Sequence, residues 1–299
     1  MTPSAANATE VVPTDAAAHV GPAAVRWANA AADALRAAPG LDADLKRHGP
    51  EIALVLGSGL GPLADAIDGA VSMAYGEVPG MPASTAPGHA GRFVLGHLEG
   101  RRVVAMQGRL HAYEGYAAAT CAYPVRIMHA LGAGRLVVSN ACGGLDPHWE
   151  AGDLMLQLDF VNHTFDHALT GPGDGIGPRF PVTFDAYDPG YLEVARRAAR
   201  RLDLTLREGV YLAIAGPAYA TRAELRMFRA WGADAIGMST VHEVTVARSL
   251  GMRVLGLSTV TDRAVPDGAE HASGDEVLAM AARVGDRFRA LVRAVLPEL

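Results

Sequence analysis

The chain has 299 residues, half of them hydrophobic, enough for one large α/β domain or two small ones with a sizeable core. Its formal net charge of −6 argues against a general nucleic-acid-binding protein, which usually carries a concentrated basic patch. Two cysteines, Cys121 and Cys142, are too few for a disulfide framework and lack zinc-site spacing, so we expect a reducing cytoplasm. No stretch approaches the roughly 18 to 20 apolar residues of a membrane helix, and we find no secretory signal pattern.

Residues 1–21 are rich in Ala, Thr and Pro and predict a flexible N-terminal tail, followed by a single domain over residues 22–299. The domain begins with apolar residues at helical spacing, and Pro39-Gly40 ends this helix. The next predicted elements are a buried strand over 52–56, a glycine-rich loop over 57–61, a hairpin of strands over 93–98 and 103–106, a helix over 123–131 and a strand over 136–139.

The second half continues the alternation of strands and helices. Its predicted helices cover 191–202, 223–231, 241–250 and 275–295, and its predicted strands cover 210–215, 235–238 and 254–258. Such alternation predicts an α/β fold with a central mixed, mostly parallel β-sheet flanked by helices. The stretch 162–188 is long for a loop in a compact domain, which indicates that it covers a site or a subunit boundary.

The segment Gly108–Tyr116 follows a predicted strand and concentrates side chains that bind anions. Arg109 and His111 come where the strand ends, and ligands bind at the mouths of parallel strands. Tyr113 and Glu114 follow directly, between glycines that permit a tight backbone. A surface turn is the better interpretation of any one of these residues, but the whole cluster favours a phosphate or carboxylate site.

Two further strand ends could contribute to the same site. The loop after residue 56 lacks the dinucleotide fingerprint, because Pro62 stands where the third glycine belongs, and no Gly-Lys-Ser/Thr follows. Its amides and Ser58 suit either a small-anion cradle or a plain tight turn. Ser239 precedes a predicted helix and suits an anion contact, a helix cap or both. Cys142, beside two glycines, is better explained as a packing residue than as a nucleophile.

Together these motifs, in this order, resemble the trimeric purine nucleoside phosphorylases from about residue 25 to the end. The resemblance rests on Leu56–Gly61, Pro87–Gly91, Gly108–Tyr116, Asn140–Gly144, Arg179–Pro181, Gly216-Pro217 and Gly237–Val241. It implies the nucleoside phosphorylase fold, a homotrimer and phosphorolysis of purine nucleosides to free base and ribose 1-phosphate. It also implies inorganic phosphate as co-substrate, with no metal or organic cofactor.

The resemblance further implies a role for each matching residue. Phosphate would be bound by Ser58, His89, Arg109, His111, Ser239 and the amide of Ala141. The ribose would contact Tyr113 and Met238, and the base would contact Tyr211, Ala220, Ile236 and Asp262. His111, Glu114 and Asp262 would be catalytic, with Glu114 orienting the phosphate-binding groups. Phe180 would reach into the site of the adjacent subunit.

Three positions depart from the enzymes that are specific for 6-oxopurines. Ala220 stands where those enzymes have Glu, and Asp262 stands where they have Asn. The related methylthioadenosine phosphorylases instead carry a small residue and Asp at these two positions. An ionised Asp suits the amino group of adenine, and a protonated one can donate to N7. Gly274, or His271 if a gap is allowed, stands where the 5′-hydroxyl would be bound.

Two alternatives to a purine nucleoside phosphorylase therefore stay open. One is a methylthioadenosine or methylthioinosine phosphorylase, favoured by Ala220, Asp262 and a 5′ pocket without a polar group. The other is a purine-binding protein without catalysis, favoured by the missing Glu. Against the second, every phosphate-binding position of the family is filled in this sequence. A nicotinamide-dependent dehydrogenase is disfavoured by Pro62.

Overall fold

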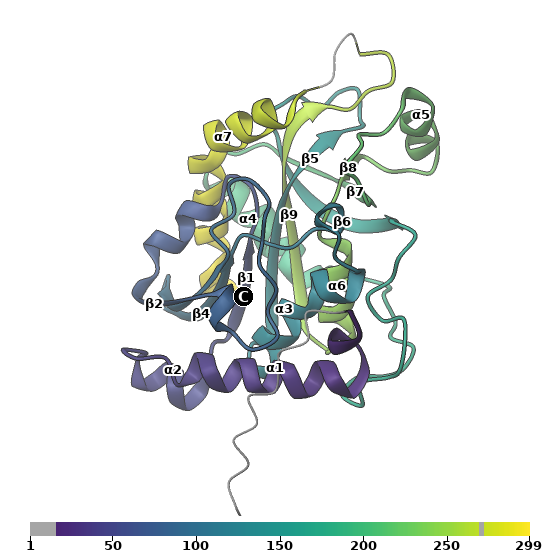
Figure 1. Ribbon diagram of the computed structural model, residues 1–299. Helices are drawn as coiled ribbons and strands as arrows, with labels where there is room; N and C mark the ends of the chain where they lie inside the picture. The colour runs from purple at the N-terminus through teal and green to yellow at the C-terminus, as the bar shows by residue number, and fades with distance from the viewer. Residues whose placement is uncertain (1–15, 269–271) are drawn as a thin grey trace, which may run out of the picture.

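The computed structural model describes residues 16–268 and 272–299 (Figure 1). The folded chain begins earlier than expected, because Ala16–His19 forms a 3₁₀ helix before helix α1 (Gly21–Arg36). His19 is buried, and its ring nitrogens lie 2.9 Å from Thr120 Oγ1 and 2.9 Å from the carbonyl oxygen of Gly80. Residues 16–21 therefore belong to the domain rather than to a tail, and residues 1–15 of the expected tail lie outside the described residues.

The described strands form one nine-stranded sheet in the order β2-β3-β4-β1-β5-β8-β7-β6-β9, with β5 also paired to β9. Five of its nine strand pairings are parallel, which confirms the predicted mixed, mostly parallel sheet. The strands are β1 (Ile52–Leu56), β2 (Asp68–Ala74), β3 (Arg92–Leu98), β4 (Arg101–Gln107), β5 (Arg135–Gly144), β6 (Leu154–His163), β7 (Leu206–Ile214), β8 (Ala235–Gly237) and β9 (Arg253–Arg263).

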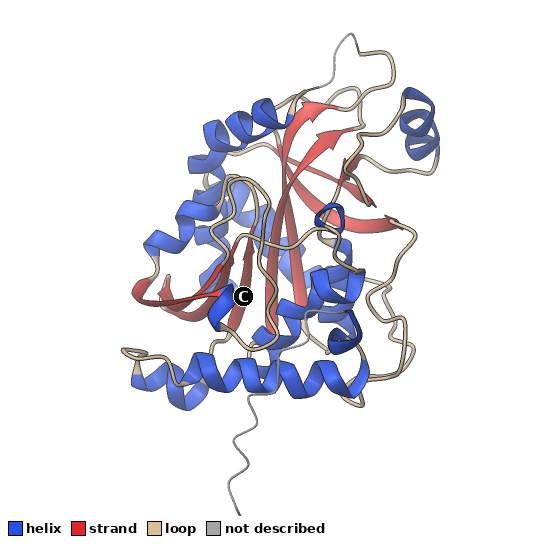
Figure 2. Ribbon diagram, viewed as in Figure 1, coloured by secondary structure: helices blue, strands red, loops and turns tan. Residues whose placement is uncertain are grey.

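Helices cover both faces of the sheet, as Figures 1 and 2 show. On one face α1, α3 and α6 pack together, and on the other α4 packs against α7. The helices not yet given bounds are α2 (Ala43–His48), α3 (Ala118–Ala130), α4 (Pro189–Arg201), α5 (Arg222–Ala230), α6 (Val241–Ser249) and α7 (Gly274–Val295). The predicted class, an α/β fold with a flanked sheet, is confirmed.

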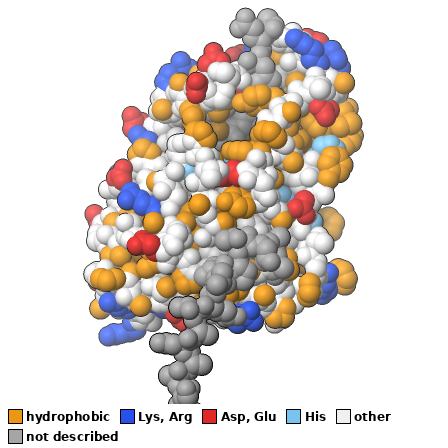
Figure 3. All heavy atoms as spheres, viewed as in Figure 1, with side chains coloured by type: hydrophobic (Ala, Val, Ile, Leu, Met, Phe, Trp, Pro, Cys, Tyr) orange, Lys and Arg blue, Asp and Glu red, His pale blue; other side chains and the backbone are white. Residues whose placement is uncertain are grey.

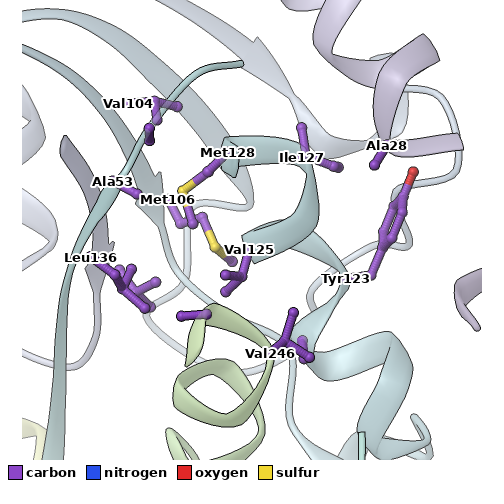
Figure 4. Packing of buried hydrophobic residues seen from close by; sticks show 14 of the residues in the cluster. Ala28, Ala53, Val104, Met106, Tyr123, Val125, Ile127, Met128, Leu136 and Val246 are labelled. Atoms are coloured by element: carbon purple, nitrogen blue, oxygen red, sulfur yellow. The ribbon is translucent and has the colours of Figure 1, made fainter. Parts of the chain in front are cut away.

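Strand β1 shows why the sheet needs both helical layers. Its five residues are all buried, and successive side chains point to opposite faces. Ile52 and Leu54 join the core under α4 and α7, whereas Ala53 and Val55 join the core under α1, α3 and α6. Figure 4 shows the second of these cores at close range, where side chains of β4 and α3 interdigitate. Such continuous apolar strands are typical of parallel sheets buried on both sides.

Some elements differ from the prediction for identifiable reasons. Strand β2 was not expected, because its residues are mostly exposed and it forms an edge of the sheet. Strand β6 and helix α2 were also not predicted from the sequence. Strands β5 and β9 extend beyond the predicted 136–139 and 254–258, because they continue through residues such as Asn140 and Thr259 that are polar yet buried.

Strands β5, β8, β7, β6 and β9 pair in succession, and the β5–β9 pairing closes them into a barrel that the sequence pattern did not predict. The stretch after β6 is a long irregular loop up to α4, as expected, and it carries the highly exposed Phe165, Phe180 and Phe184. On the face seen in Figure 3, charged side chains of both signs are dispersed among apolar ones. No helix within 16–268 and 272–299 combines the length and apolar character needed to cross a bilayer.

Candidate active site

A cavity lies where the carboxyl ends of β1, β4, β5 and β9 meet the end of β8. Most of the predicted site residues line it, namely Ser58, His89, Arg109, His111, Tyr113, Ala141, Ala220, Ile236, Met238, Ser239 and Asp262. It is also lined by residues that were not predicted as ligands, including Asn140, Cys142, Ile214, Tyr219, Leu225, Thr261, Ala264 and Val277. The loops therefore converge at one edge of the sheet, as expected, but strand β8 runs antiparallel to β5 there.

Strand β8 reaches the cavity from the opposite direction, because it pairs antiparallel with β5. The pairing of Gly143 with Ile236 places the following residues, Met238 and Ser239, beside the end of β5. A Cβ on Gly237 would lie 2.2 Å from the hydroxyl oxygen of Tyr211, so only glycine allows this close approach. Tyr211 is fully buried behind Gly237 and is not among the residues that line the cavity.

Arg109 forms the cationic centre of one end of the cavity, and its side chain is almost completely buried. Its Nη1 donates to Ser239 Oγ at 2.8 Å and to Thr240 Oγ1 at 3.1 Å. Its Nη2 is buried and has no hydrogen-bond partner among the described residues. Because a buried guanidinium group rarely leaves donors unpaired, this end of the cavity is built to receive an oxyanion.

A second buried charge, Glu243 on α6, lies behind the guanidinium. Its Oε1 is 3.3 Å from Arg109 Nε, and both side chains are nearly inaccessible to water. Burial raises the pKa of the Glu243 carboxyl, while the charge of Arg109 opposes that rise. The pair fixes Arg109 from the side away from the cavity.

Glu114 acts from outside the cavity as the anchor of His111. Its Oε1 accepts from the His111 amide at 2.8 Å and lies 3.1 Å from His111 Nδ1, and its Oε2 accepts from the Thr85 amide and hydroxyl. These hydrogen bonds lower the pKa of Glu114 to about 2, against the opposing effect of burial. An ionised Glu114 holds the proton of a neutral His111 on Nδ1 and so leaves Nε2 available to a ligand.

Three rings stack along the wall beside this anion end. The ring centroids of His89 and His111 are 5.2 Å apart, and those of His111 and Tyr113 are 4.5 Å apart. Burial lowers the pKa of His89 to about 4 and lowers that of His111, and burial raises the pKa of Tyr113 to about 12. At neutral pH both imidazoles are therefore uncharged, and Arg109 supplies the positive charge.

The ends of β1 and β5 are tied together at the cavity floor. Ser139 Oγ donates to the carbonyl oxygen of Val55 and accepts from the Gly57 amide at 3.1 Å. A Cβ on Gly57 would lie 2.5 Å from the carbonyl oxygen of Ser139, so the loop that carries Ser58 requires glycine here. This contact brings Ser58 and Ala141 to the same cavity, as predicted.

The other end of the cavity is mostly apolar and contains one carboxylate. Asp262, at the end of β9, is mostly buried and accepts from Thr261 Oγ1 at 3.1 Å. Ala220 and Tyr219 line this end, with Leu225 from α5. Burial raises the pKa of the Cys142 thiol, in agreement with a packing role. Tyr219 lies between Gly216-Pro217 and Ala220, which were singled out from the sequence, so its position could have indicated a base contact, which was predicted for Tyr211 instead.

Besides Tyr211 and Glu114, two predicted site residues do not line the cavity, and a third lies outside the described part of the chain. Phe180 is 85% exposed on the long loop and does not line the cavity of its own chain, so its contact with a neighbouring subunit stays a prediction. His271 lies outside the described residues. Gly274 begins α7, and a Cβ at this position would meet no atom within 4 Å. A group of three potential cation ligands, Asp42, Asp44 and His97, does not line the cavity.

An oxyanion pocket beside an apolar pocket with one carboxylate, at the strand ends of an α/β sheet, defines a class of proteins that bring phosphate to a small organic ligand. The chain belongs to the phosphorylase superfamily, whose family model matches residues 51–297. This confirms the family that the motifs indicated.

Relatives and solved structures agree with this assignment. The chain is 46% identical to purine nucleoside phosphorylase 1 of Geobacillus stearothermophilus over 251 residues, 84% of this chain and 92% of the relative. It is 42% identical to the purine nucleoside phosphorylase of Rattus norvegicus over 261 residues, 85% and 90% of the two chains. The crystal structure of Schistosoma mansoni purine nucleoside phosphorylase in complex with adenosine is 34% identical, with a TM-score of 0.83 over 92% of this chain and 97% of that one.

Proposed function

We propose that this protein is a purine nucleoside phosphorylase that cleaves purine nucleosides with inorganic phosphate. The observation that carries the proposal is Arg109, a buried guanidinium group with an unpaired donor at the cavity. Ser58, Ser239, His89, His111 and the amide of Ala141 surround the same end and complete a phosphate site. Structures of Schistosoma mansoni relatives with adenosine and with inosine support nucleosides as the second substrate.

The residues of the site contribute position and charge to the reaction. A phosphate oxygen bonds to the anomeric carbon as the bond from that carbon to purine N9 breaks, and the bonding electron pair moves into the purine. Arg109 and Ser239 hold the phosphate, while Tyr113 and Met238 confine the ribose between the two ends of the cavity. Asp262 is the group that stabilises or protonates the departing base, because it is the carboxylate at the base end. The proposed chemistry needs neither a metal nor an organic cofactor.

We further propose that 6-aminopurine nucleosides are accepted better than they are by 6-oxopurine-specific relatives. The support is Asp262, whose carboxylate accepts from an exocyclic amino group, and Ala220, which has no polar atom to pair with a protonated N1. A base pocket that leaves polar groups of guanine or hypoxanthine unpaired loses affinity for them.

A methylthioadenosine or methylthioinosine phosphorylase is the second candidate. It is favoured by Gly274, which has no side chain at the start of α7, and by the apolar Val277, which lies one turn further along α7 and lines the cavity. A non-catalytic purine-binding protein has no comparable support, because it has no use for the oxyanion end.

One experiment tests both candidates: release of free base from inosine, guanosine, adenosine and methylthioadenosine, with and without phosphate. We expect phosphate-dependent cleavage that Arg109→Ala abolishes, and turnover of none of the four would refute the proposal. Asp262→Asn should shift the ratio of adenosine to inosine cleavage towards inosine, because an amide can donate to a 6-oxo group. An unchanged ratio would show that Asp262 does not read the base.

We also propose that the protein is a homotrimer of the cytoplasm. Phe165, Phe180 and Phe184 are 85 to 90% exposed on one loop, which is unusual for a free surface and typical of an interface. Both cysteines are free and buried, as suits a reducing compartment. Light scattering should give a mass three times that of the 31.2 kDa chain.

A further inference from the structure

Thr240, between β8 and α6, has a backbone conformation that a threonine rarely adopts. Its φ is 75° and its ψ is −51°, and the Val241 amide donates to the carbonyl oxygen of Ser239 at 2.8 Å across it. This is a tight γ-turn with a positive φ at a β-branched residue, which is a strained arrangement. Strain of this kind persists where the surrounding structure fixes it, and it is concentrated at functional sites.

The Thr240 side chain does not serve the helix that it precedes. It is the N-cap residue of α6, yet it makes no hydrogen bond to the amides of the first turn. Its hydroxyl is instead directed to the anion end, although Thr240 does not line the main cavity. The usual reason for a threonine at a helix start therefore does not explain this one.

The hydrogen bonds of the hydroxyl can be assigned completely. Thr240 Oγ1 accepts from Arg109 Nη1 at 3.1 Å and from Asn140 Nδ2 at 2.7 Å, and this occupies both of its lone pairs. The Thr240 hydroxyl proton is then donated to Ser239 Oγ, which lies 3.1 Å away. The direction of every bond around this oxygen follows from the fact that Arg and the Asn amino group only donate.

The same assignment fixes the hydrogen bonds of the Ser239 hydroxyl. Its Oγ accepts from Arg109 Nη1 at 2.8 Å and from Thr240, so both of its lone pairs are also occupied. Its remaining proton can be donated into the cavity that Ser239 lines or to the hydroxyl oxygen of Tyr211, which lies beside Ser239. The hydroxyl can thus give a hydrogen bond to a ligand oxygen and cannot accept one.

We propose that Thr240 is a positioning residue for phosphate, which orients the Arg109 guanidinium group and makes Ser239 a donor to the anion. Thr240 links three elements whose relative positions shape the anion end. It contacts the end of β4 through Arg109, β5 through Asn140 and the β8–α6 turn through Ser239. The proposal rests on the phosphorolysis proposed above and adds to it a residue that does not itself line the cavity.

The test compares Thr240→Val, which keeps the shape but removes the hydroxyl, with Thr240→Ser, which keeps the hydroxyl. Steady-state kinetics with inosine or adenosine give the KM for phosphate and for nucleoside separately. We expect T240V to raise the phosphate KM by about tenfold or more, the loss expected for a disturbed charge-assisted hydrogen bond, with a nucleoside KM changed less than about twofold. T240S should restore most of the phosphate affinity.

Thr245→Val is the matched control, since it removes another buried threonine hydroxyl from the same helix. Thr245 Oγ1 donates to the carbonyl oxygen of Val241 at 2.7 Å and takes no part in the anion end. T245V should leave the phosphate KM unchanged even if it lowers the melting temperature. If T240V does not fold, Thr240→Gly replaces it, because glycine tolerates the positive φ and equally lacks the hydroxyl.

Isothermal titration with inorganic phosphate alone separates this inference from the proposed function. Weaker phosphate binding by T240V, with wild-type binding by T245V, would support the role of Thr240 even if no nucleoside were cleaved. Equal phosphate affinity in T240V and the wild type would overturn it, as would an equal loss in T240S and T240V. A fall in kcat alone, with both KM values unchanged, would likewise overturn it.

Discussion

Replacement of Glu114 by Gln tests whether charge holds His111 in place. The carboxylate accepts four hydrogen bonds, two from His111 and two from Thr85, whereas the amide has a single acceptor oxygen. A pKa lowered from 4.5 to about 2 corresponds to roughly 3 kcal/mol, since each pH unit is worth about 1.36 kcal/mol. Because Glu114 is only partly buried and solvent screens its charge, we expect Glu114→Gln to lower the free energy of unfolding at pH 7 by about 2 kcal/mol.

The dependence of this loss on pH distinguishes charge from packing. A carboxyl with a depressed pKa stabilises the folded state above its unfolded pKa, and this stabilisation disappears as the pH falls from about 4.5 towards 2. Urea unfolding followed by circular dichroism should therefore show the wild type and E114Q converging at acid pH. A difference that stays constant from pH 7 to pH 3 would refute the reasoning. Glu276→Gln is the control, since Glu276 accepts from the Ser273 amide and hydroxyl in an exposed turn.

Three further predictions follow from single contacts. Gly237→Ala should lower the melting temperature, because its Cβ would lie 2.2 Å from the Tyr211 hydroxyl and one of the two groups must move; a wild-type melting temperature would contradict this. Arg109→Lys should raise the phosphate KM by roughly tenfold or more in initial-rate assays, because an ammonium group cannot reproduce the planar fork; an unchanged KM would mean that any cation suffices. Phe180→Ala should raise the nucleoside KM, because the proposed trimer would place this side chain in the site of the adjacent subunit, and an unchanged nucleoside KM would exclude that contact.

The phosphate end could be predicted from the sequence because its ligands follow apolar strands directly. Arg109 and His111 come just after β4, and Ser58 comes just after β1, so the strand periodicity also located the ligands. The sequence could not reveal that Thr240 joins Arg109, Asn140 and Ser239, because its role depends on a hydrogen bond to Asn140, which is 100 positions away.

The base end was predicted less well, and the reason is geometric. Tyr211 occurs within a predicted strand, and alternation alone does not say which face of β7 meets the cavity. In the structure β8 pairs with β7, and Gly237 of β8 covers the Tyr211 hydroxyl. Tyr219 lies in a loop without periodicity, where the position of a side chain depends on tertiary contacts.

The bond between Arg109 and Ser239 joins positions 130 residues apart, one from each half of the chain. Phosphate affinity therefore cannot appear in a partly folded chain that has completed only its N-terminal strands, because this long-range contact must form before the anion end is complete. A bound anion in turn stabilises the whole domain rather than one lobe, by an amount that grows with the logarithm of its concentration. The resistance of this protein to unfolding should then report the phosphate level of its surroundings.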